Sequence, residues 1–343
     1  MALTNTHLDE YRLTYELSNM DKFENRLSIY GAFEAYKADT QFTIPGAAEL
    51  VRQYDGHRVV SIPVLDRSTM TSTASRHCAP GTVVPTSTYV TPTWTTIEVD
   101  FNMVPAEHKG NYLSYQNVFN HQMTTLERTF LAALDTAGYT SLEANHSAVN
   151  AADGNPYTVA ADSMVVAAAD NDLFFNELGS ILLANDLPAD AVNIVSSPRV
   201  TALMKELNAQ GPGNQTNTAF QFGAFSFYAS NRVTVGAADR DTLFASPQGS
   251  LAFLSYVDEQ SRLGGDIGIW KWSTEVLPRL GFEVGLLYKA YCTDLSAAAY
   301  GSANETSIYE MYQFSFDYSF VVAYTSAASA IGTPILKANF TKA

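Results

Sequence analysis

The chain has 343 residues, a formal net charge of −15 at pH 7 and a hydrophobic fraction of 46%, values that fit a folded protein with roughly one to three domains. The acidic balance excludes nonspecific binding to nucleic acid, because phosphates are held by Lys and Arg. The two cysteines lie in different contexts and define neither a disulfide framework nor a CxxC metal site. No basic-then-apolar signal pattern is present, and no apolar run approaches the roughly 18 residues of a membrane span, so we expect an unexported protein without membrane contact.

The first 40 residues or so form an amphipathic arm. Met20, Phe23, Leu27 and Tyr30 recur at helical spacing. A short second helix is expected between Pro45 and Gly56. An apolar arm ahead of the main fold must cover either the core of its own chain or the surface of a neighbour.

A strand candidate at Val59–Leu65 is followed by a long connection. Its expected partner is Thr96–Met103, where apolar and polar residues alternate with period two. The intervening Ser68–Thr93 is rich in Ser and Thr and carries three prolines. Connections of this length are uncommon inside compact domains, where the median is about 4 to 6 residues. We interpret this segment as an extended, two-legged arm, with an ordinary surface loop as the alternative.

The longest uninterrupted helical pattern runs from Ser114 to Gly138. Seven apolar side chains fall on one stripe of this helix, namely Tyr115, Phe119, Met123, Leu126, Phe130, Leu134 and Ala137. Ser114 is a candidate cap at the start, and Gly138 suits the left-handed position beyond the end. Gln116, Asn117, Asn120, Thr124 and Glu127 lie off the stripe. We therefore expect the helix to lie across an apolar surface with its other side more hydrated.

The second half of the sequence predicts an α/β segment followed by a long strand. Asp170 or Asn171 caps a helix that ends near Asn185, Val192–Val195 is a short buried strand, and Ser197-Pro198 begins another helix. After the polar loop 208–218, short strands are expected at Phe220–Tyr228 and Ser250–Val257. Aromatic residues then alternate from about Tyr312 to Tyr324, which predicts a strand of roughly 13 residues, twice the usual length.

No catalytic motif is found. The sequence contains neither GxGxxG nor GxxxxGK[ST], and neither GxSxG nor HExxH. No two histidines have the i, i+4 spacing of a helical metal site, and the acidic pairs Asp170/Asp172 and Asp239/Asp241 are typical of caps and turns. We therefore predict no catalytic, cofactor-binding or metal-ligating residue and no cofactor. A soluble enzyme whose site is assembled from scattered residues is an alternative.

The order of these elements resembles the major capsid proteins of tailed bacteriophages, which have the Hong Kong 97-like fold. The stretches AVNIVSSPRVTALMKEL and FQFGAFSFYASNRV resemble the strand, Ser-Pro-capped helix and returning strands of the axial domain in that family. The resemblance implies an α+β fold with an N-terminal arm (1–58), an extended β-hairpin loop (59–104), an α/β axial domain (164–267) and a peripheral domain with its β-sheet and spine helix (105–163 and 268–343).

The same resemblance implies a structural protein without enzymatic activity. It would self-assemble into pentamers and hexamers of an icosahedral head around double-stranded DNA, in the cytoplasm of a bacterial host, without sequence-specific DNA binding. Separate scaffolding, portal and cement proteins are possible partners. The expected assembly contacts lie in the extended loop and the polar loop: Ser75, Arg76, Thr86, Gly211, Gly213 and Asn214.

One acidic stretch fits this reading. Between Arg128 and Arg199 there is no Lys or Arg but there are nine acidic residues, which suit a solvated face or a wall facing packed DNA. Three alternatives to the capsid reading stay open. The first is an encapsulin-type nanocompartment shell protein, the second is the enzyme mentioned above, and the third is another virion part such as a tail or decoration protein.

Overall fold

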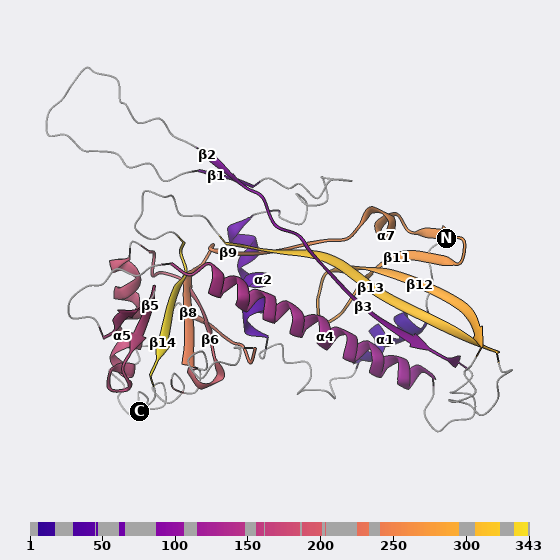
Figure 1. Ribbon diagram of the computed structural model, residues 1–343, viewed down its shortest axis with the longest axis horizontal. Coiled ribbons are helices and arrows are strands. Elements are labelled where there is room, and N and C mark those ends of the chain that lie inside the picture. The colour runs from indigo at the N-terminus through magenta and orange to yellow at the C-terminus, as the bar shows by residue number, and fades with distance from the viewer. Residues whose placement is uncertain are drawn as a thin grey trace, which may run out of the picture.

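The computed structural model describes fourteen parts of the chain. These are residues 6–17, 30–44, 46, 62–65, 87–105, 115–147, 156–160, 162–185, 187–200, 203, 225–232, 241–294, 306–322 and 333–341. They form one long helix and two six-stranded sheets, one along the helix and one at its carboxyl end (Figure 1). The mixture of helices with two sheets confirms the predicted α+β class.

The first sheet is antiparallel throughout and is built around one very long strand. The strand order is β10-β11-β12-β13-β3, and β9 pairs with the far end of β13. The bounds are β3 Thr95–Met103, β9 Leu251–Tyr256, β10 Gly265–Ile267, β11 Trp270–Val276, β12 Glu283–Asp294 and β13 Thr306–Val322. At 17 residues β13 is longer than the predicted 13, so it reaches both ends of the sheet. The short helix α7, Glu259–Leu263, precedes β10.

The second sheet has the order β4-β5-β14-β8-β6-β7 and mixes both strand directions. The pairs β5–β14 and β6–β7 are parallel, and the other pairs are antiparallel. The strands are β4 Thr158–Ala160, β5 Ser163–Val166, β6 Val192–Ser196, β7 Phe225–Ala229, β8 Thr242–Pro247 and β14 Leu336–Phe340. Helix α5, Asn171–Ala184, follows a 3-10 turn at Ala168–Asp170 and shares a separate apolar core with this sheet.

Local sequence signals account for several elements of this second unit. The predicted helix after Asp170 and the predicted strand at Val192 are confirmed as α5 and β6. The Oγ atom of Ser197 accepts a hydrogen bond of 3.4 Å from the backbone N–H of Val200, as expected of a cap. Asp170 is the cap residue of α5, but its side chain makes no capping hydrogen bond.

The long helix α4, Tyr115–Ala144, has 30 residues and is here called the spine helix. Six of the seven residues of its predicted stripe, all but Ala137, lie in or against the main core. The ring of Phe130 lies 5.2 Å from that of Phe316, and the ring of Phe119 lies 5.1 Å from that of Tyr312. The opposite side is hydrated. The hydroxyls of four exposed threonines on that side donate hydrogen bonds to the backbone carbonyls four residues earlier: Thr125, Thr129, Thr136 and Thr140.

The prediction that Gly138 lies beyond the end of this helix is wrong. The helix continues to Ala144, and Gly138 is buried inside it. A Cβ atom at this position would lie 3.4 Å from the ring of Phe320 and 3.5 Å from the backbone of Ala32. The glycine therefore serves close packing between helices and sheet, a requirement that the local sequence does not reveal. Glu127, expected on the wetter side, is also buried.

The predicted pairing of Val59–Leu65 with Thr96–Met103 is wrong too. Strand β1, Ile62–Leu65, pairs antiparallel with β2, Ser87–Val90, at the base of the long connection. Strand β3 pairs instead with β13, over nine residue pairs. The alternation in β3 is real, with Ile97, Val99 and Phe101 against the core, but alternation specifies which face is buried and not which strand is the partner.

Two helices from the amino-terminal region pack on the main core. Helix α1 spans Thr6–Leu17, and helix α2 spans Gly31–Thr43. Leu8 and Tyr11 of α1 are buried in the core of their own chain. Of the two possibilities for the arm, the first therefore holds for α1, which covers the core of its own chain. Met20, Phe23, Leu27 and the helix expected near Gly56 lie outside the described residues.

Sheet membership departs from the division inferred by resemblance at five strands. Strands β4 and β14, placed with the peripheral parts 105–163 and 268–343, belong to the second sheet. Strands β9 and β10, placed in the axial part 164–267, and strand β3, placed in the extended loop 59–104, belong to the first sheet. The chain therefore crosses between the two sheets more often than contiguous boundaries allow. The remaining boundaries stay a prediction.

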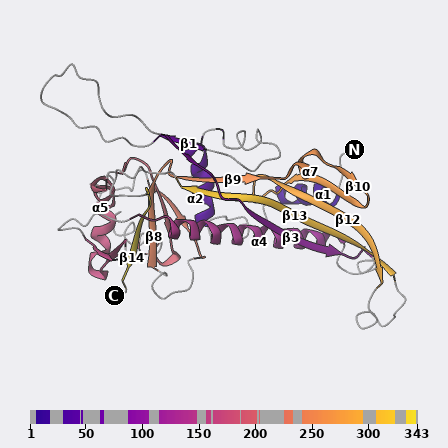
Figure 2. The same cartoon turned by 45° about the horizontal axis from the view of Figure 1, so that its top comes forward.

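The molecule is elongated along the spine helix, and the β1–β2 pair lies away from both sheets (Figures 1 and 2). The second sheet and α5 occupy one end, whereas β11, β12 and α1 lie toward the other end (Figure 2). Among the described residues, none of the helices combines the length and apolarity needed to cross a bilayer.

Candidate functional site: the junctions of the spine helix

Helix α2 is fixed to the spine helix by a buried carboxylate. Oδ1 of Asp135 accepts hydrogen bonds from the backbone N–H groups of Ala32 at 2.9 Å and Phe33 at 3.1 Å. These groups lie in the first turn of α2, where no intrahelical acceptor exists and a negative charge is favourable. Burial raises the pKa of Asp135, and the hydrogen bonds that it accepts, including one from Ser230, lower it. Asp135 therefore caps a helix that begins about 100 residues away in the sequence.

The same junction includes the end of the second sheet. Oδ2 of Asp135 accepts a hydrogen bond of 2.6 Å from the hydroxyl of Ser230, which follows β7. Tyr30 forms an isolated β-bridge with Ser230, and a Cβ atom on Gly31 would lie 2.5 Å from the carbonyl oxygen of Ala229. Only a glycine admits this approach. One carboxylate thus joins the spine helix, α2 and the second sheet.

The other end of α2 carries a second buried carboxylate. Asp39 accepts backbone hydrogen bonds from Gly249 at 2.8 Å, Ser250 at 2.9 Å and Leu251 at 2.8 Å. These three donors form the turn between β8 of the second sheet and β9 of the first sheet. Asp39 is 1% exposed, and its bonds to Ser250 and Leu251 are buried, so it satisfies two donors that water does not reach. Helix α2 therefore fixes the point at which the chain passes from one sheet to the other.

Aromatic packing supports both ends of this junction. The ring of Phe33 meets that of Phe253 edge-on at 5.1 Å, and the ring of Tyr36 meets that of Phe320 at 4.8 Å. The hydroxyl of Tyr36 donates a hydrogen bond of 3.0 Å to Ser141 of the spine helix. On the side of the second sheet, Tyr139 of the spine helix lies 5.5 Å from Phe244. Edge-to-face contacts of this kind favour one fixed arrangement of the two sheets.

Helix α1 contacts the spine helix through a buried polar cluster. The hydroxyl of Tyr11 donates a hydrogen bond of 2.8 Å to Oε2 of Glu127, and Nε of Arg279 lies 3.4 Å from the same oxygen. Arg279 comes from the turn between β11 and β12. Burial raises the pKa of Glu127 to about 7, while the Tyr11 hydroxyl and the charge of Arg279 lower it. Three separate elements thus meet at one carboxylate.

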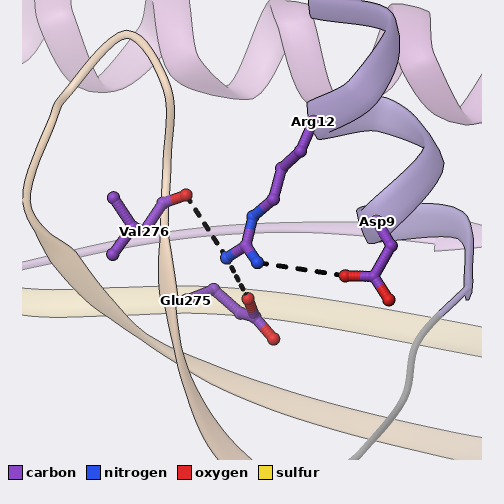
Figure 3. Close-up of polar contacts among 4 residues, drawn as sticks. All are labelled: Asp9, Arg12, Glu275 and Val276. Atoms are coloured by element: carbon purple, nitrogen blue, oxygen red, sulfur yellow. Dashed lines mark hydrogen bonds and ion pairs between the residues drawn. The ribbon is translucent and has the colours of Figure 1, made fainter. Parts of the chain in front are cut away.

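A more exposed set of contacts lies beside this cluster (Figure 3). Arg12 of α1 forms an ion pair with Glu275 of β11 and reaches the carbonyl oxygen of Val276 at 3.4 Å. On the helix side, Oδ1 of Asp9 lies 3.9 Å from Nη1 of the same guanidinium. Near the start of α1, Nδ1 of His7 lies 2.6 Å from Oε1 of Gln116 on the spine helix. Helix α1 is therefore held to both the spine helix and the first sheet.

Several large apolar side chains remain exposed on the described surface. Ile267 and Ile269 flank the β10–β11 turn at the edge of the first sheet and are 60% and 59% exposed, and Leu263 at the end of α7 is 76% exposed. Leu183 on α5 and Phe42 at the end of α2 are exposed to 63% and 61%. Grouped apolar exposure of this kind is typical of surfaces that another molecule covers.

The structure does not test the residues that the sequence singled out for assembly. Ser75, Arg76, Thr86, Gly211, Gly213 and Asn214 all lie outside the described residues. What is described is the base of the extended loop, where β1 and β2 pair in register from Ile62↔Val90 to Leu65↔Ser87. In the described part of the chain, no three His, Cys, Asp or Glu residues are grouped so that they could hold a metal ion.

Sequence reasoning missed the three buried carboxylates that fix the junctions, Asp39, Glu127 and Asp135. Asp39 and Asp135 lie among apolar neighbours on helices, where an isolated acid is easily read as part of a solvated face. Asp135 was in fact counted in the acidic stretch, yet it is 0% exposed. The pattern offered a signal for Glu127 only, which follows the stripe residue Met123 by four positions.

Comparisons with known proteins give structural neighbours only. No protein-family model and no curated protein matches the sequence. A chain from a solved structure of Mycobacterium phage Che8 superposes with a TM-score of 0.47 at 12% identity, over 85% of this chain and 88% of that one. The capsid structure of the cyanophage P-SCSP1u gives a TM-score of 0.45 at 8% identity, covering 84% and 85% of the two chains. The capsid of Ralstonia phage GP4 gives a TM-score of 0.45 at 10% identity, over 83% of this chain and 84% of that one.

These superpositions extend over most of each chain, but their TM-scores and identities are low. The function is therefore argued from the elements and contacts of this chain itself.

Proposed function

We propose that this chain is the major capsid protein of a tailed bacteriophage and that it self-assembles into an icosahedral shell. One observation carries the proposal. A 30-residue helix lies along a sheet whose central strand has 17 residues, and the helix ends against a second sheet with its own core. This arrangement agrees with the order of arm, extended loop, spine helix, peripheral sheet and axial domain that the sequence resembles.

The proportions of the molecule suit a wall-forming subunit. A helix of 30 residues measures about 45 Å at a rise of 1.5 Å per residue, and a strand of 17 residues measures about 56 Å at 3.3 Å per residue. An elongated plate of this kind exposes long edges, and copies that bind by different edges close into rings. The extended loop beyond the β1–β2 pair would lie over a neighbouring copy in such a ring.

The buried junctions supply the rigidity that a shell needs. Asp39 and Asp135 fix both ends of α2 between the two sheets, through backbone hydrogen bonds that water does not reach. Because these contacts are internal, each copy brings the same angle between its sheets to every interface.

The contents and partners of the shell form part of the proposal. Exposed acids of the Lys- and Arg-free stretch, such as Asp162 and Asp190, would face packed double-stranded DNA and let it slide without sequence-specific binding. Scaffolding, portal and cement functions would come from separate proteins. The chain would act in the virion after assembly in the bacterial cytoplasm, and it would have no enzymatic role.

Electron microscopy of the purified full-length protein tests the proposal. We expect rings and closed shells in negative stain, with a sedimentation profile that depends on protein concentration. A protein that stays monomeric at every concentration and salt tested would overturn the proposal. Tubes, or binding only to preformed shells, would also overturn it in favour of another virion part.

The contents of the particles separate the phage shell from the nanocompartment alternative. Shells from infected or induced cells should contain nuclease-protected double-stranded DNA if the protein encloses a genome. Shells that instead enclose a single enzyme species would contradict the genome-container role, although they would leave the shell-forming role intact.

A further inference from the structure

We propose that helix α1 is a proton-dependent strap: its docking on the spine helix takes up a proton at Glu127, so rising pH promotes its release. The inference concerns contacts within one chain and does not depend on shell formation. It rests on the position of Glu127 where α1, the spine helix and the β11–β12 turn meet.

The geometry makes Glu127 a part of the docking contact. Its side chain is 0% exposed, and on one side it is covered by Tyr11, which donates its hydroxyl hydrogen to Oε2 at 2.8 Å. Tyr11 itself is only 4% exposed. Removing α1 would uncover the carboxylate on this side and return it toward water. A charged carboxylate loses much more hydration on burial than a protonated one, so docking favours the protonated form.

Two titratable or charged side chains face this carboxylate, and a further charged set lies on α1 and β11. Tyr11 faces it from α1, and burial next to Glu127 raises the pKa of the phenol, which therefore stays a donor. Arg279 faces it from the β11–β12 turn and stays charged at all relevant pH values. Farther along α1, Arg12 pairs with Glu275 of β11, with Asp9 beside it. The charge of Arg279 thus partly offsets the rise in the pKa of Glu127 that burial causes, without cancelling it.

The sign of the pH dependence follows from the direction of the shift. With α1 docked, burial raises the pKa of Glu127 from its ordinary value of 4.5 to about 7. A raised pKa in the docked state means that this state binds the proton more tightly than the open state does. The protonation energy therefore supports docking fully below about pH 4.5, and this support is lost as pH rises through about 7. Burial also raises the pKa of Glu275, and the charge of Arg12 opposes that rise.

Glu127 is one of several contacts that hold the described side chains of α1. The apolar part includes Leu8 and Tyr11, which are buried, and His7, whose ring lies 4.7 Å from that of Tyr115, whereas Leu13 is 55% exposed. The polar part consists of the Arg12 contacts with β11 and the His7 contact with Gln116. Leu8, Tyr11 and Arg12 lie within five consecutive residues, so α1 should open as one unit.

Hydrogen exchange of the full-length protein tests the strap. The observable is the opening equilibrium of the α1 amides, with intrinsic exchange rates divided out, at pH 6 and pH 8. A single proton with these two pKa values raises the opening equilibrium about tenfold over this interval. Amides in the centre of the spine helix should not share this change.

Three variants make the test specific. Glu127→Gln should abolish the pH dependence of α1 opening, whatever its absolute level, because the titrating group is gone. Glu10→Gln changes an exposed acid on the same helix and should keep the full tenfold dependence. Tyr11→Phe should raise α1 opening more at pH 8 than at pH 6, because the phenol hydrogen bond favours the charged form of Glu127.

Two outcomes would overturn the inference. One is equal α1 protection at pH 6 and pH 8 in the unsubstituted protein, which needs no variant to fold. The other is a Glu127→Gln variant that retains the tenfold change, since the proton would then bind elsewhere.

Discussion

Oδ2 of Asp39 accepts a hydrogen bond of 2.8 Å from the backbone N–H of Leu251, 212 residues later in the sequence. Together with the contacts to Gly249 and Ser250, this bond holds the turn through which the chain passes from the second sheet to the first. A helix that begins near the amino terminus therefore sets the geometry between two sheets made mostly from the carboxyl-terminal half.

Replacement of this carboxylate should destabilise the whole chain. In Asp39→Ala, three backbone donors, two of them in buried hydrogen bonds, lose their acceptor, and we expect the free energy of unfolding to fall by about 3 kcal/mol. Urea unfolding at neutral pH measures the change. The matched control is Asp190→Ala at an exposed position, where we expect a change within about 0.5 kcal/mol. Equal stability of the two variants would show that the turn does not depend on Asp39.

Two buried glycines should respond to the same substitution with very different losses of stability. Gly31→Ala places a methyl group 2.5 Å from the backbone oxygen of Ala229, which cannot move without shifting β7. We expect a loss of about 2 to 3 kcal/mol in unfolding free energy. At Gly138, the nearest atom is 3.4 Å away on the side chain of Phe320, and alanine favours a helix by about 1 kcal/mol.

Gly138→Ala should therefore change the stability by less than about 1 kcal/mol in either direction. Thermal unfolding of both variants side by side makes the comparison. A Gly138→Ala variant as damaged as Gly31→Ala would contradict the packing described for the spine helix.

The contact between the spine helix and the first sheet can be measured as a pair. Phe130→Ala should lower the free energy of unfolding by about 3 to 5 kcal/mol, because loss of a fully buried ring leaves a cavity between helix and sheet. A double-mutant cycle with Phe316→Ala should give a coupling of about 0.5 to 1.5 kcal/mol, as the two rings lie 5.2 Å apart. Phe42→Ala is the control, since that ring is 61% exposed and should matter little. A coupling near zero would mean that the two rings do not stabilise each other.

The proposed assembly contacts make a separate prediction. Arg76→Ala and Asn214→Ala should leave the unfolding free energy unchanged but raise the protein concentration at which shells form, by about tenfold or roughly 1.4 kcal/mol. Light scattering against concentration measures this threshold. Glu10→Gln serves as the control with an unchanged threshold. Variants that assemble like the original protein would remove these residues from the interface.

Periodicity predicted the elements well wherever one face of an element is buried by its own chain. The stripe of the spine helix and the alternation of β13 both follow from which side chains face the shared core. Periodicity could not identify strand partners, so β3 was paired with the wrong strand. It also gave no warning that Gly138, a residue type that often ends helices, would serve as a spacer within one.

Strand β14 shows a different reason for failure. Its sequence, LKANF, places Lys337 and Asn339 among apolar residues, and it was not predicted as a strand. The structure satisfies both polar groups with distant partners: Lys337 pairs with Glu143, and Asn339 accepts a hydrogen bond of 3.0 Å from Thr242. Buried polar residues of this kind depend on tertiary neighbours. The carboxylates of Asp39, Glu127 and Asp135 escaped prediction for the same reason.

The length of β13 has a mechanical consequence. On one edge it pairs with β12 and then with β9, and on the other edge it pairs with β3. Backbone hydrogen bonds between antiparallel strands run perpendicular to the strands. A tensile load along β13 would therefore act on these bonds in shear and distribute itself over many of them at once, whereas a load across the sheet would peel them apart one by one. The subunit should thus resist stretching along its long axis far better than it resists peeling at its edges.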